Sequence, residues 1–398
     1  MFAANSSAGF KRIGIYVHIP FCERKCFYCD FYSVEDHSRR DEFIDSLVRE
    51  IGLFSSDRIG HSVVDTVFFG GGTPSLLSSE EIGLVLEAIQ SRFEFSLDVE
   101  FTIECNPGTV SQGSLASYRR IGINRLSFGV QSFFDDELRF LSRIHDSRQA
   151  AEAITLAHKC GFENVNLDLM YGLPGQSIER VMSNLNRAVE LNPEHISAYN
   201  LIVEPNTPLF ASVASGNIEP QNELTQASMY ELTMSFLGEK GYEHYEISNY
   251  SRSRFRCRHN LKYWDCKEYV GFGPSAHSYM NGTRWWNISS LNKYLFELSE
   301  GRLPISAKEE LSESDLADEF VMLQLRQGKL ELNTLSERFK IDLDAEFISD
   351  LVRSGYAVVS SNRLTLTNKG FTVCDEIAER CLSRPTDIQE DPCQLQSR

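Results

Sequence analysis

The 398-residue chain has no uninterrupted apolar stretch of the roughly 18 residues that a membrane-spanning helix needs. It also has no excess of basic residues, because 39 Lys and Arg stand against 56 Asp and Glu, a formal net charge of −17. Nucleic-acid backbones require clustered cations, so we expect no nucleic-acid partner. Ten cysteines are too few for a disulfide scaffold of this length. Residues 1–12 lack the apolar segment of a secretory signal, and we therefore expect a cytoplasmic protein.

Apolar runs alternate with amphipathic helical segments between residues 13 and 240. The predicted strands are Ile13–Ile19, Val63–Phe69, Val99–Cys105, Arg125–Val130, Val165–Tyr171 and Ile196–Val203. The predicted helices are Asp41–Phe54, Ser79–Phe93, Ser114–Ile121, Ser147–Cys160, Ile178–Leu191 and Leu224–Lys240. Six such units predict an α/β fold with a parallel sheet, and they fit a partial (βα)6 TIM-like barrel better than a closed eight-unit barrel.

The pattern changes after this alternating region. We predict a barrel core over residues 12–241, followed by an extension of the sheet over 242–305 that is rich in aromatics and glycines. Helices and a hairpin over 306–382 predict a small winged-helix-like module. Residues 383–398 have no periodicity, and we expect a disordered tail there.

The chemistry-bearing residues follow the predicted strands where those strands end. A cysteine segment follows the first strand, a glycine run at 70–72 the second, and an acidic residue, Glu104, ends the third. Gln131 and Asp168 lie at the ends of the fourth and fifth strands. Because the carboxyl ends of parallel strands share one rim, we expect one functional site at that rim.

Cys22, Cys26 and Cys29 place three thiols in one short loop with Cys-x3-Cys-x2-Cys spacing. Structural zinc takes four closed ligands, whereas a [4Fe-4S] cluster held by three cysteines keeps one iron open. A zinc site completed by Cys105 or a histidine is the alternative. Aromatic side chains surround the thiols and are expected to shield a cluster from water: Phe21, Phe27, Tyr28 and Phe31.

This cysteine motif, followed by Gly-Gly-Gly-Thr-Pro after the second strand, resembles that of the radical S-adenosylmethionine (SAM) enzymes. The resemblance implies a partial (βα)6 barrel, a [4Fe-4S] cluster on the three cysteines, and SAM bound to the open iron. It implies SAM contacts at the matching positions Tyr16, Gly71, Gly72, Thr73, Glu104, Gln131, Arg143 and Asp168. Carboxylates suit ribose hydroxyls, and an arginine suits a carboxylate. Each residue taken alone also has an ordinary structural interpretation.

Over residues 12–380 the chain resembles the oxygen-independent coproporphyrinogen III oxidase family. The true oxidases of that family carry a fourth cysteine, where this chain has Phe31, and a longer N-terminal extension than the 21 residues before Cys22. The segment His-Asn-Leu-Lys-Tyr-Trp, which begins at His259, instead resembles the His-Asn-x-x-Tyr-Trp signature of a haem chaperone subgroup. We therefore expect His259 to ligate haem. The alternative is a hydrogen-bonded structural histidine among core aromatics, and Cys257 or Cys266 could also supply a thiolate.

The resemblance implies a haem chaperone that binds a cluster, SAM and haem and transfers haem to haem-dependent apoproteins, including respiratory proteins at the membrane. A homodimer is possible under this hypothesis. The alternative is a coproporphyrinogen III oxidase that decarboxylates propionates, and a further one is a radical SAM enzyme with another substrate. The acidic segment Glu309–Asp318 argues against DNA binding by the C-terminal module, which we interpret as a lid or a protein-contact module. No catalytic residue is assigned.

Overall fold

The computed structural model describes residues 11–55 and 60–382. The chain divides into two compact units. Among the described residues, the first contains 11–55, 60–244, 248–263 and 267–310, and the second contains 245–247, 264–266 and 311–382. The sheet extension predicted over 242–305 thus folds largely with the barrel. The predicted tail at 383–398 lies outside the described residues.

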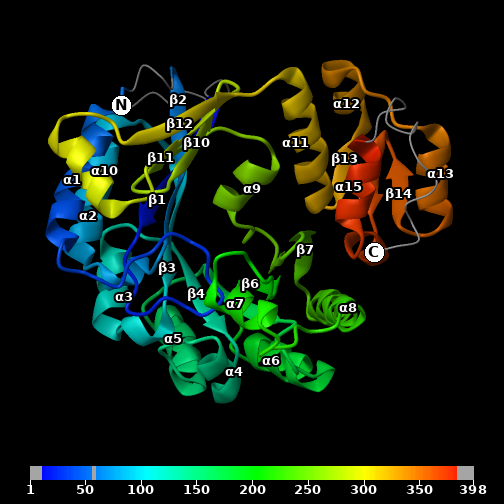
Figure 1. Ribbon diagram of the computed structural model, residues 1–398, viewed down its shortest axis with the longest axis horizontal. Helices are drawn as coiled ribbons and strands as arrows, with labels where there is room; N and C mark the ends of the chain where they lie inside the picture. Colours follow the sequence, from blue (N-terminus) through cyan, green and yellow to red (C-terminus); the bar gives the residue numbers. More distant parts are fainter. Residues whose placement is uncertain (1–10, 56–59, 383–398) are drawn as a thin grey trace, which may run out of the picture. The chain divides into compact units, whose positions relative to one another are not determined.

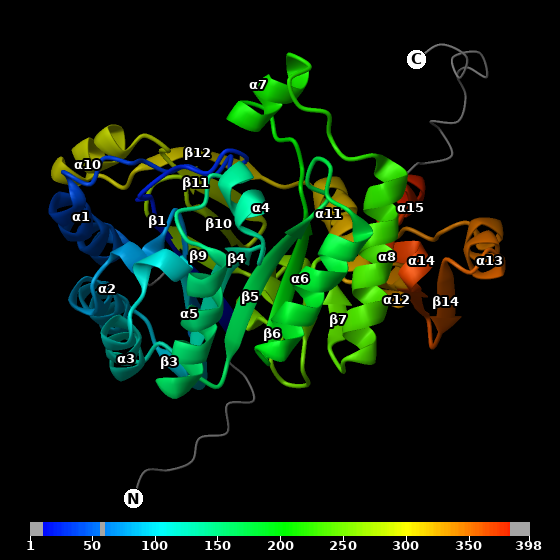
Figure 2. The same cartoon turned by 90° about the horizontal axis from the view of Figure 1, so that it is seen from below.

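The first unit is built on six parallel strands that pair in chain order (Figure 1). The strands are β1 (Lys11–Ile19), β2 (Ser62–Gly71), β3 (Phe95–Cys105), β4 (Arg125–Gln131), β5 (Val165–Tyr171) and β6 (His195–Asn200). The helices of this region are α1 (Arg40–Leu53), α2 (Ser79–Arg92), α3 (Gln112–Arg120), α4 (Asp135–Phe140), α5 (Ser147–Lys159), α6 (Ile178–Glu190), α7 (Pro208–Ala214) and α8 (Glu223–Glu239). The predicted partial barrel is confirmed. Figure 2 shows α7 beyond the ends of β5 and β6.

Local sequence signals account for these elements. The barrel strands are buried on both faces. The face towards the helices is apolar, whereas the face towards the barrel interior carries polar side chains such as Arg125, Ser127 and Asn166. Helix α2 begins with a capping box in which Ser78 and Glu81 satisfy each other's backbone N–H groups, and α5 begins with the same arrangement of Asp146 and Gln149. Arg40 Nε donates to Glu81 Oε1 at 2.6 Å and ties α1 to α2.

Short strands extend both edges of the barrel sheet. Strand β9 (Tyr269–Phe272) pairs in parallel with β1, and the antiparallel strands β10 (His277–Met280), β11 (Thr283–Asn287) and β12 (Ile305–Glu310) continue the sheet from there. At the other edge, β8 (Asn249–Ser251) pairs antiparallel with β6, and β7 (Glu243–Glu246) follows β8 in the strand order. Two helices belong to this region: α9 (Arg258–Trp264) and α10 (Leu291–Ser299).

Glu50 of α1 fixes the extension to the barrel through a buried carboxylate. Its oxygens accept hydrogen bonds from the Gly273 backbone N–H at 2.8 Å, from Asn287 Nδ2 at 2.6 Å and from the Tyr294 hydroxyl at 2.6 Å. Burial raises the pKa of Glu50 to about 7 despite these donors. The carboxyl group thus connects α1 to the loop before β10, to β11 and to α10.

The second unit combines helices with a three-stranded antiparallel sheet in the order β13, β15, β14. Its elements are α11 (Glu313–Arg326), β13 (Lys329–Glu331), α12 (Leu332–Phe339), α13 (Ala345–Arg353), β14 (Ala357–Ser360), β15 (Arg363–Leu366), α14 (Asn368–Phe371) and α15 (Cys374–Leu382). The unit contains helices and the β14–β15 hairpin, and β13 adds a strand that was not predicted. No helix within residues 11–55 and 60–382 has the length and apolar character needed to cross a membrane.

Candidate functional site

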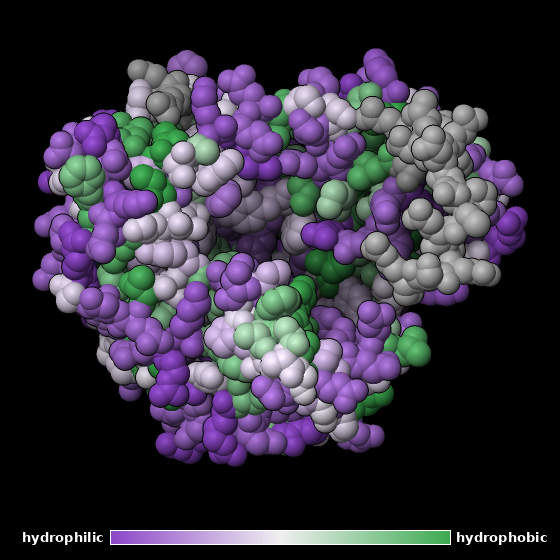
Figure 3. Space-filling view, viewed as in Figure 1, coloured by the Kyte–Doolittle hydropathy of each residue, from purple (hydrophilic) through white to green (hydrophobic). Residues whose placement is uncertain are grey.

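A pocket of about 400 Å³ lies where the barrel strands end. Its lining includes Cys22, Cys26 and Cys29, together with Gly71, Gly72, Thr73, Glu104, Gln131, Arg143 and Asp168. A cavity of about 290 Å³ adjoins it and is lined by Tyr16 and His259, the remaining predicted residues, and it shares Gly71, Glu104 and Asp168 with the pocket. Figure 3 shows the surface of the molecule hollowed near the centre of the view, next to α9. The structure therefore brings together residues from five strand ends.

The cysteine loop is held by hydrogen bonds to its neighbours. The Cys22 backbone N–H donates to the Val34 carbonyl at 2.9 Å, and the Thr73 hydroxyl donates to Cys22 Sγ at 3.6 Å. Arg143 Nη1 lies 3.3 Å from Cys26 Sγ. Burial raises the pKa of the Cys29 thiol to about 11, so its thiolate requires a metal that displaces the proton.

The three thiols of the cysteine loop line one pocket, as a cluster on these cysteines requires. Within the described part of the chain, no three His, Cys, Asp or Glu side chains converge closely enough to hold one metal ion. A cubane cluster has a different requirement, because each of its thiolates binds a different iron atom.

Aromatic shielding of the loop is achieved by three of the four predicted side chains. Phe27 and Tyr28 pack against a buried cluster that contains Leu201 and Leu209, and Phe21 is fully buried. The fourth side chain does not follow the prediction, because Phe31 is 64% exposed. It points away from a packed interior and forms part of the pocket lining instead.

The glycine segment after β2 allows its backbone to lie against the cysteine loop. Gly71 has φ +110°, and a Cβ there would lie 2.6 Å from the His18 imidazole. A Cβ on Gly72 would lie 2.6 Å from the Phe21 carbonyl oxygen. The Gly72 and Thr73 N–H groups donate to carbonyls of the β1 end and the loop after it. Only glycine therefore fits these two positions, and the segment presents bare backbone to the pocket.

Two carboxyl groups lie on the pocket wall. Glu104 Oε2 accepts a hydrogen bond from the Gly71 N–H at 3.2 Å, and Asp168 Oδ1 accepts one from Asn166 Nδ2 at 2.7 Å. Burial, reinforced by the nearby Asp168 charge, raises the pKa of Glu104 to about 8, and burial also raises the pKa of Asp168. Such groups gain most from a ligand that donates hydrogen bonds, as the hydroxyls of a ribose do.

Arg143 and Gln131 complete the wall on the β4 side. Arg143 Nη2 donates to the Gly129 carbonyl at 2.6 Å, while its buried Nε has no partner among the described residues. Gln131 adopts a left-handed backbone with φ 68° at the end of β4. Such strain in a residue other than glycine is typical of functional sites. The unpaired donor of Arg143 fits an anionic group in the pocket.

His259 lies inside the barrel and not on an accessible surface. Its side chain is 1% exposed, Nδ1 is 2.8 Å from the Thr66 hydroxyl, and Nε2 is 2.8 Å from the Tyr263 hydroxyl. Its ring stacks on Phe68 with centroids 5.2 Å apart. Burial lowers the pKa of His259 to about 3, so the imidazole is neutral. The geometry favours the structural alternative, because iron ligation requires one of these two hydrogen bonds to break.

Cys257, a candidate thiolate ligand, and His145, which was not a candidate, also have structural surroundings. Cys257 is fully buried with its thiol 3.8 Å from Glu100 Oε1. His145 is buried between the Asn106 side chain and the Val130 carbonyl, at 3.2 and 3.1 Å, and it links the ends of β3 and β4. Neither residue lines the pocket of about 400 Å³.

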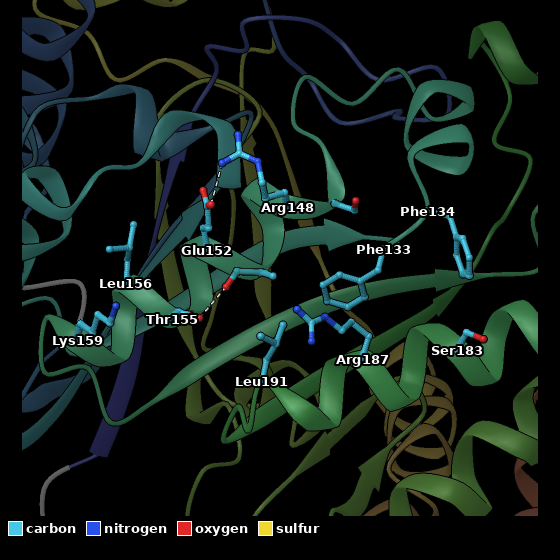
Figure 4. Close-up of a pocket in the computed structure, with 12 residues that line it drawn as sticks. Phe133, Phe134, Arg148, Glu152, Thr155, Leu156, Lys159, Ser183, Arg187 and Leu191 are labelled. Carbon is cyan, nitrogen blue, oxygen red and sulfur yellow. Dashed lines mark hydrogen bonds and ion pairs between the residues drawn. The ribbon is translucent and has the colours of Figure 1, made fainter.

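A larger concavity of about 820 Å³ lies on the outside of the barrel, between α5 and α6 (Figure 4). Its cations are engaged locally, since Arg148 pairs with Glu152 at 2.8 Å and Arg187 pairs with Glu190 at 2.9 Å. It contains none of the predicted site residues. We therefore assign the functional site to the strand ends.

Several residues of the pocket were not predicted. Ile144, Tyr199 and Ile202 line it, and each of them is at least 37% exposed. Their signal in the sequence is position alone, because Tyr199 and Ile202 come at the end of β6 and Ile144 follows α4. Thr66, which holds His259, was also missed, and Tyr263 was named only as part of the His-Asn-x-x-Tyr-Trp segment and not as a partner of His259. No sequence pattern indicates that Thr66 or Tyr263 contacts His259.

The sequence profile of the Radical SAM superfamily matches residues 16–188. A protein of Bacillus subtilis named heme chaperone HemW is 37% identical over 313 residues, covering 78% of this chain and 82% of that protein. A Mycobacterium tuberculosis protein of the same name is 36% identical over 373 residues, covering 93% of this chain and 94% of that protein. Among solved structures, the radical SAM enzyme coproporphyrinogen III oxidase (HemN) from Escherichia coli superposes with a TM-score of 0.79 at 24% identity, covering 94% and 90% of the two chains. This last likeness shows the shared fold.

Proposed function

The chain belongs to the HemW family of radical SAM proteins, and on that premise we propose that it is a haem chaperone. In this function it binds a [4Fe-4S] cluster, SAM and haem, and it passes haem to haem-dependent apoproteins, among them respiratory proteins. The observation that best supports the proposal is the pocket that unites three thiols with all of the predicted SAM residues except Tyr16, which lines the adjoining cavity.

Cys22, Cys26 and Cys29 would hold the cluster, with the fourth iron left for SAM. When bound, the cluster supplies one-electron chemistry and an open coordination position. Phe27 and Tyr28 exclude water from the inner side of the loop through their packing on the hydrophobic cluster below. The protein thus contributes a dry and fixed position for the group.

The pocket wall would orient SAM through complementary polar groups. Arg143, whose Nε is unpaired, would meet the carboxylate, and the backbone at Gly71–Thr73 would receive the amino group. Glu104 and Asp168 would accept hydrogen bonds from ribose hydroxyls, a contact that compensates for the cost of burying them. Gln131 and Tyr16 would complete the contacts.

Haem as cargo is supported by the names of the relatives and by the His-Asn-x-x-Tyr-Trp segment. Ligation by His259 stays a prediction of that motif alone, because the ring is buried and bonded at both nitrogens. A homodimer and a contact role for the second unit also stay predictions.

The experiment that tests the proposal is a haem titration of the anaerobically reconstituted, full-length protein, followed by Soret absorbance. Saturable binding, and then movement of haem from the loaded protein to a haem-depleted respiratory cytochrome, is the expected result. The matched control replaces Cys22, Cys26 and Cys29 with serine, which removes the cluster and reports whether transfer depends on it. The absence of saturable haem binding would overturn the proposal.

The alternative function is a coproporphyrinogen III oxidase, which the intact SAM-type pocket keeps open. Incubation of the reconstituted protein with coproporphyrinogen III, SAM and a reductant distinguishes the two. Decarboxylated product would favour the oxidase, and its absence alongside haem transfer would favour the chaperone.

A further inference from the structure

His18 is a buried histidine near the end of β1 that has no part in the contacts proposed so far. Its side chain is 4% exposed. Nε2 lies 2.9 Å from the Tyr32 carbonyl oxygen, and Nδ1 lies 3.1 Å from the Tyr16 hydroxyl. The imidazole therefore joins the segment that follows the cysteine loop to Tyr16, one of the residues expected to contact SAM.

The protonation state of the His18 imidazole decides the direction of its two hydrogen bonds. Burial lowers the pKa of His18 to about 4, so the ring is neutral at neutral pH and carries a single N–H. A carbonyl oxygen can only accept a hydrogen bond, so this N–H is on Nε2 and donates to Tyr32. Nδ1 is left as an acceptor, and the surroundings thus select one tautomer.

This tautomer orients the hydroxyl group of Tyr16. Burial, reinforced by the nearby Glu104 charge, raises the pKa of Tyr16 well above its usual value, so the phenol keeps its proton. A phenol has one O–H to donate, and Nδ1 of His18 accepts it at 3.1 Å. The Tyr16 oxygen then has only lone pairs to offer. Tyr16 therefore meets a ligand as a hydrogen-bond acceptor and not as a donor.

Packing holds the ring of Tyr16 in this position. The ring stacks on that of Phe68 with centroids 6.3 Å apart, and the His259 ring lies 6.4 Å from it. A Cβ on Gly70 would lie 3.0 Å from Tyr16 Cε2, so the ring also rests against the glycine run after β2. Because the ring is enclosed, the direction of its O–H depends on the acceptor at His18.

The same imidazole lies against the backbone that would receive the amino group of SAM. A Cβ on Gly71 would lie 2.6 Å from His18 Cε1, and Gly71 and Tyr16 both line the cavity of about 290 Å³. A positively charged amino group has three N–H donors and no acceptor. An oxygen that can only accept suits such a group, and a hydroxyl that pointed its proton at the group would oppose it.

We propose that His18 is a positioning residue for SAM, which engages the hydroxyl proton of Tyr16 so that the Tyr16 oxygen accepts from the positively charged amino group of the ligand. The inference rests on the proposed function and adds how one of its contacts is oriented. His18 lines neither the pocket nor the adjoining cavity. Its effect on SAM therefore passes through Tyr16.

The test is a double-mutant cycle on SAM affinity, measured by equilibrium dialysis of the anaerobically reconstituted, full-length protein. We expect Tyr16→Phe to raise the dissociation constant about tenfold, equivalent to about 1.4 kcal/mol, and His18→Ala to raise it about fivefold. The double variant should lose no more than Tyr16→Phe alone, because the oriented oxygen is already absent. Losses that multiply to roughly fiftyfold would show independent action and overturn the proposal.

His195→Ala is the matched control for the loss of a buried histidine. His195 is fully buried, its Nδ1 lies 2.6 Å from Asn166 Oδ1, and it stands at the start of β6, the end opposite to the site. Any effect of this control on SAM affinity should be the same factor in the wild type and in Tyr16→Phe. Coupling of His195→Ala to Tyr16→Phe as strong as that of His18→Ala would overturn the proposal, because a general structural effect would then explain both.

His18→Gln keeps the test open where the alanine variant does not fold. Its amide supplies one donor for Tyr32 and one acceptor for Tyr16, so we expect SAM affinity within about threefold of the wild type. A His18→Gln variant that binds SAM as weakly as His18→Ala would contradict the assigned hydrogen-bond directions.

Two spectroscopic readouts separate this proposal from the proposed function. Iron–sulfur absorbance reports cluster content in every variant, and the change that SAM causes in the electron paramagnetic resonance spectrum of the reduced cluster reports whether SAM reaches the iron. If both His18 variants assemble no cluster while Tyr16→Phe does, His18 acts on the cysteine loop through Tyr32 and the proposal is overturned. If the wild type with its cluster binds no SAM, the proposed function itself fails.

Discussion

The substitution His259→Ala is expected to destabilise the barrel rather than to remove an iron ligand selectively. Truncation removes a ring that is 1% exposed, and it leaves the Thr66 hydroxyl and the Tyr263 hydroxyl without their 2.8 Å partners. Each buried polar group that loses its hydrogen-bond partner costs about 1 to 3 kcal/mol of stability, and the cavity left by the removed ring adds to that cost. We expect a loss of roughly 3 to 5 kcal/mol, a large part of the 5 to 15 kcal/mol of a typical domain.

Urea unfolding of the full chain, monitored by far-UV circular dichroism, measures this loss. The control is His277→Ala, because His277 is an exposed histidine of β10 in the same unit and its ring stacks on Trp286, which is not buried. We expect a clearly lower midpoint for His259→Ala and an unchanged midpoint for the control. A His259→Ala protein that unfolds at the wild-type midpoint yet no longer binds haem would refute this reasoning and support iron ligation.

The neutral state of His259 adds a pH dependence to the same experiment. Burial lowers its pKa to about 3, with Lys262 and Arg125 opposing protonation as well, against about 6.5 in the unfolded chain. The unfolded state therefore binds the extra proton between these values, and stability falls as the pH drops from about 6.5 towards 3. A folded His259→Gln variant should lose less stability over that interval. An identical acid dependence in both proteins would contradict the assignment of a buried neutral imidazole.

Three further predictions concern other sites. Gly129→Ala would place a Cβ 2.9 Å from Arg143 Nη2, and we expect SAM affinity by equilibrium binding to fall roughly tenfold, about 1.4 kcal/mol, with the cluster retained. The pKa of Glu50 is raised from 4.5 to about 7, so its contribution to stability is complete below pH 4.5 and is lost as the pH rises through 7. In a Glu50→Gln variant, the free energy of unfolding should therefore vary less with pH over this interval. Gly72→Ala would bring a Cβ to 2.6 Å from the Phe21 carbonyl, and we expect about 1 to 3 kcal/mol of destabilisation and a lower yield of reconstituted cluster, read from iron–sulfur absorbance.

The barrel could be predicted because its signals are local. Buried parallel strands are continuous apolar runs, and the helices between them have helical periodicity and capping residues, as at Ser78 before α2. The strand ends then meet at one rim by topology, which is why residues as distant as Cys22 and Asp168 could be assigned to one site from sequence. Their convergence in one pocket agrees with that expectation.

Exposure could not be predicted in the same way. Phe31 stands among shielded aromatics in the sequence, but its side chain is 64% exposed because Phe21, Phe27 and Tyr28 already occupy the space below the loop. Side-chain direction in an irregular loop depends on contacts with distant residues, here Leu201 and Leu209. No periodicity in the loop encodes those contacts.

The α9 motif does not decide between two roles, because histidine, tyrosine and tryptophan suit a ligand site and a packed interior equally well. Helix α9 has seven residues, too few for a helical periodicity to be visible in the sequence. The residues that fix its position belong to other parts of the chain. Glu100 of β3 accepts the His259 N–H at 3.1 Å, Asp65 of β2 pairs with Lys262 at 2.5 Å, and a Cβ on Gly14 would lie 2.8 Å from the Lys262 side chain. Helix α9 can therefore approach β1 only because residue 14 is glycine, and the buried charge of Lys262 is balanced by Asp65 of β2. These contacts give the motif a structural task that is independent of haem, so a change at His259 cannot report on cargo binding until its effect on folding has been measured.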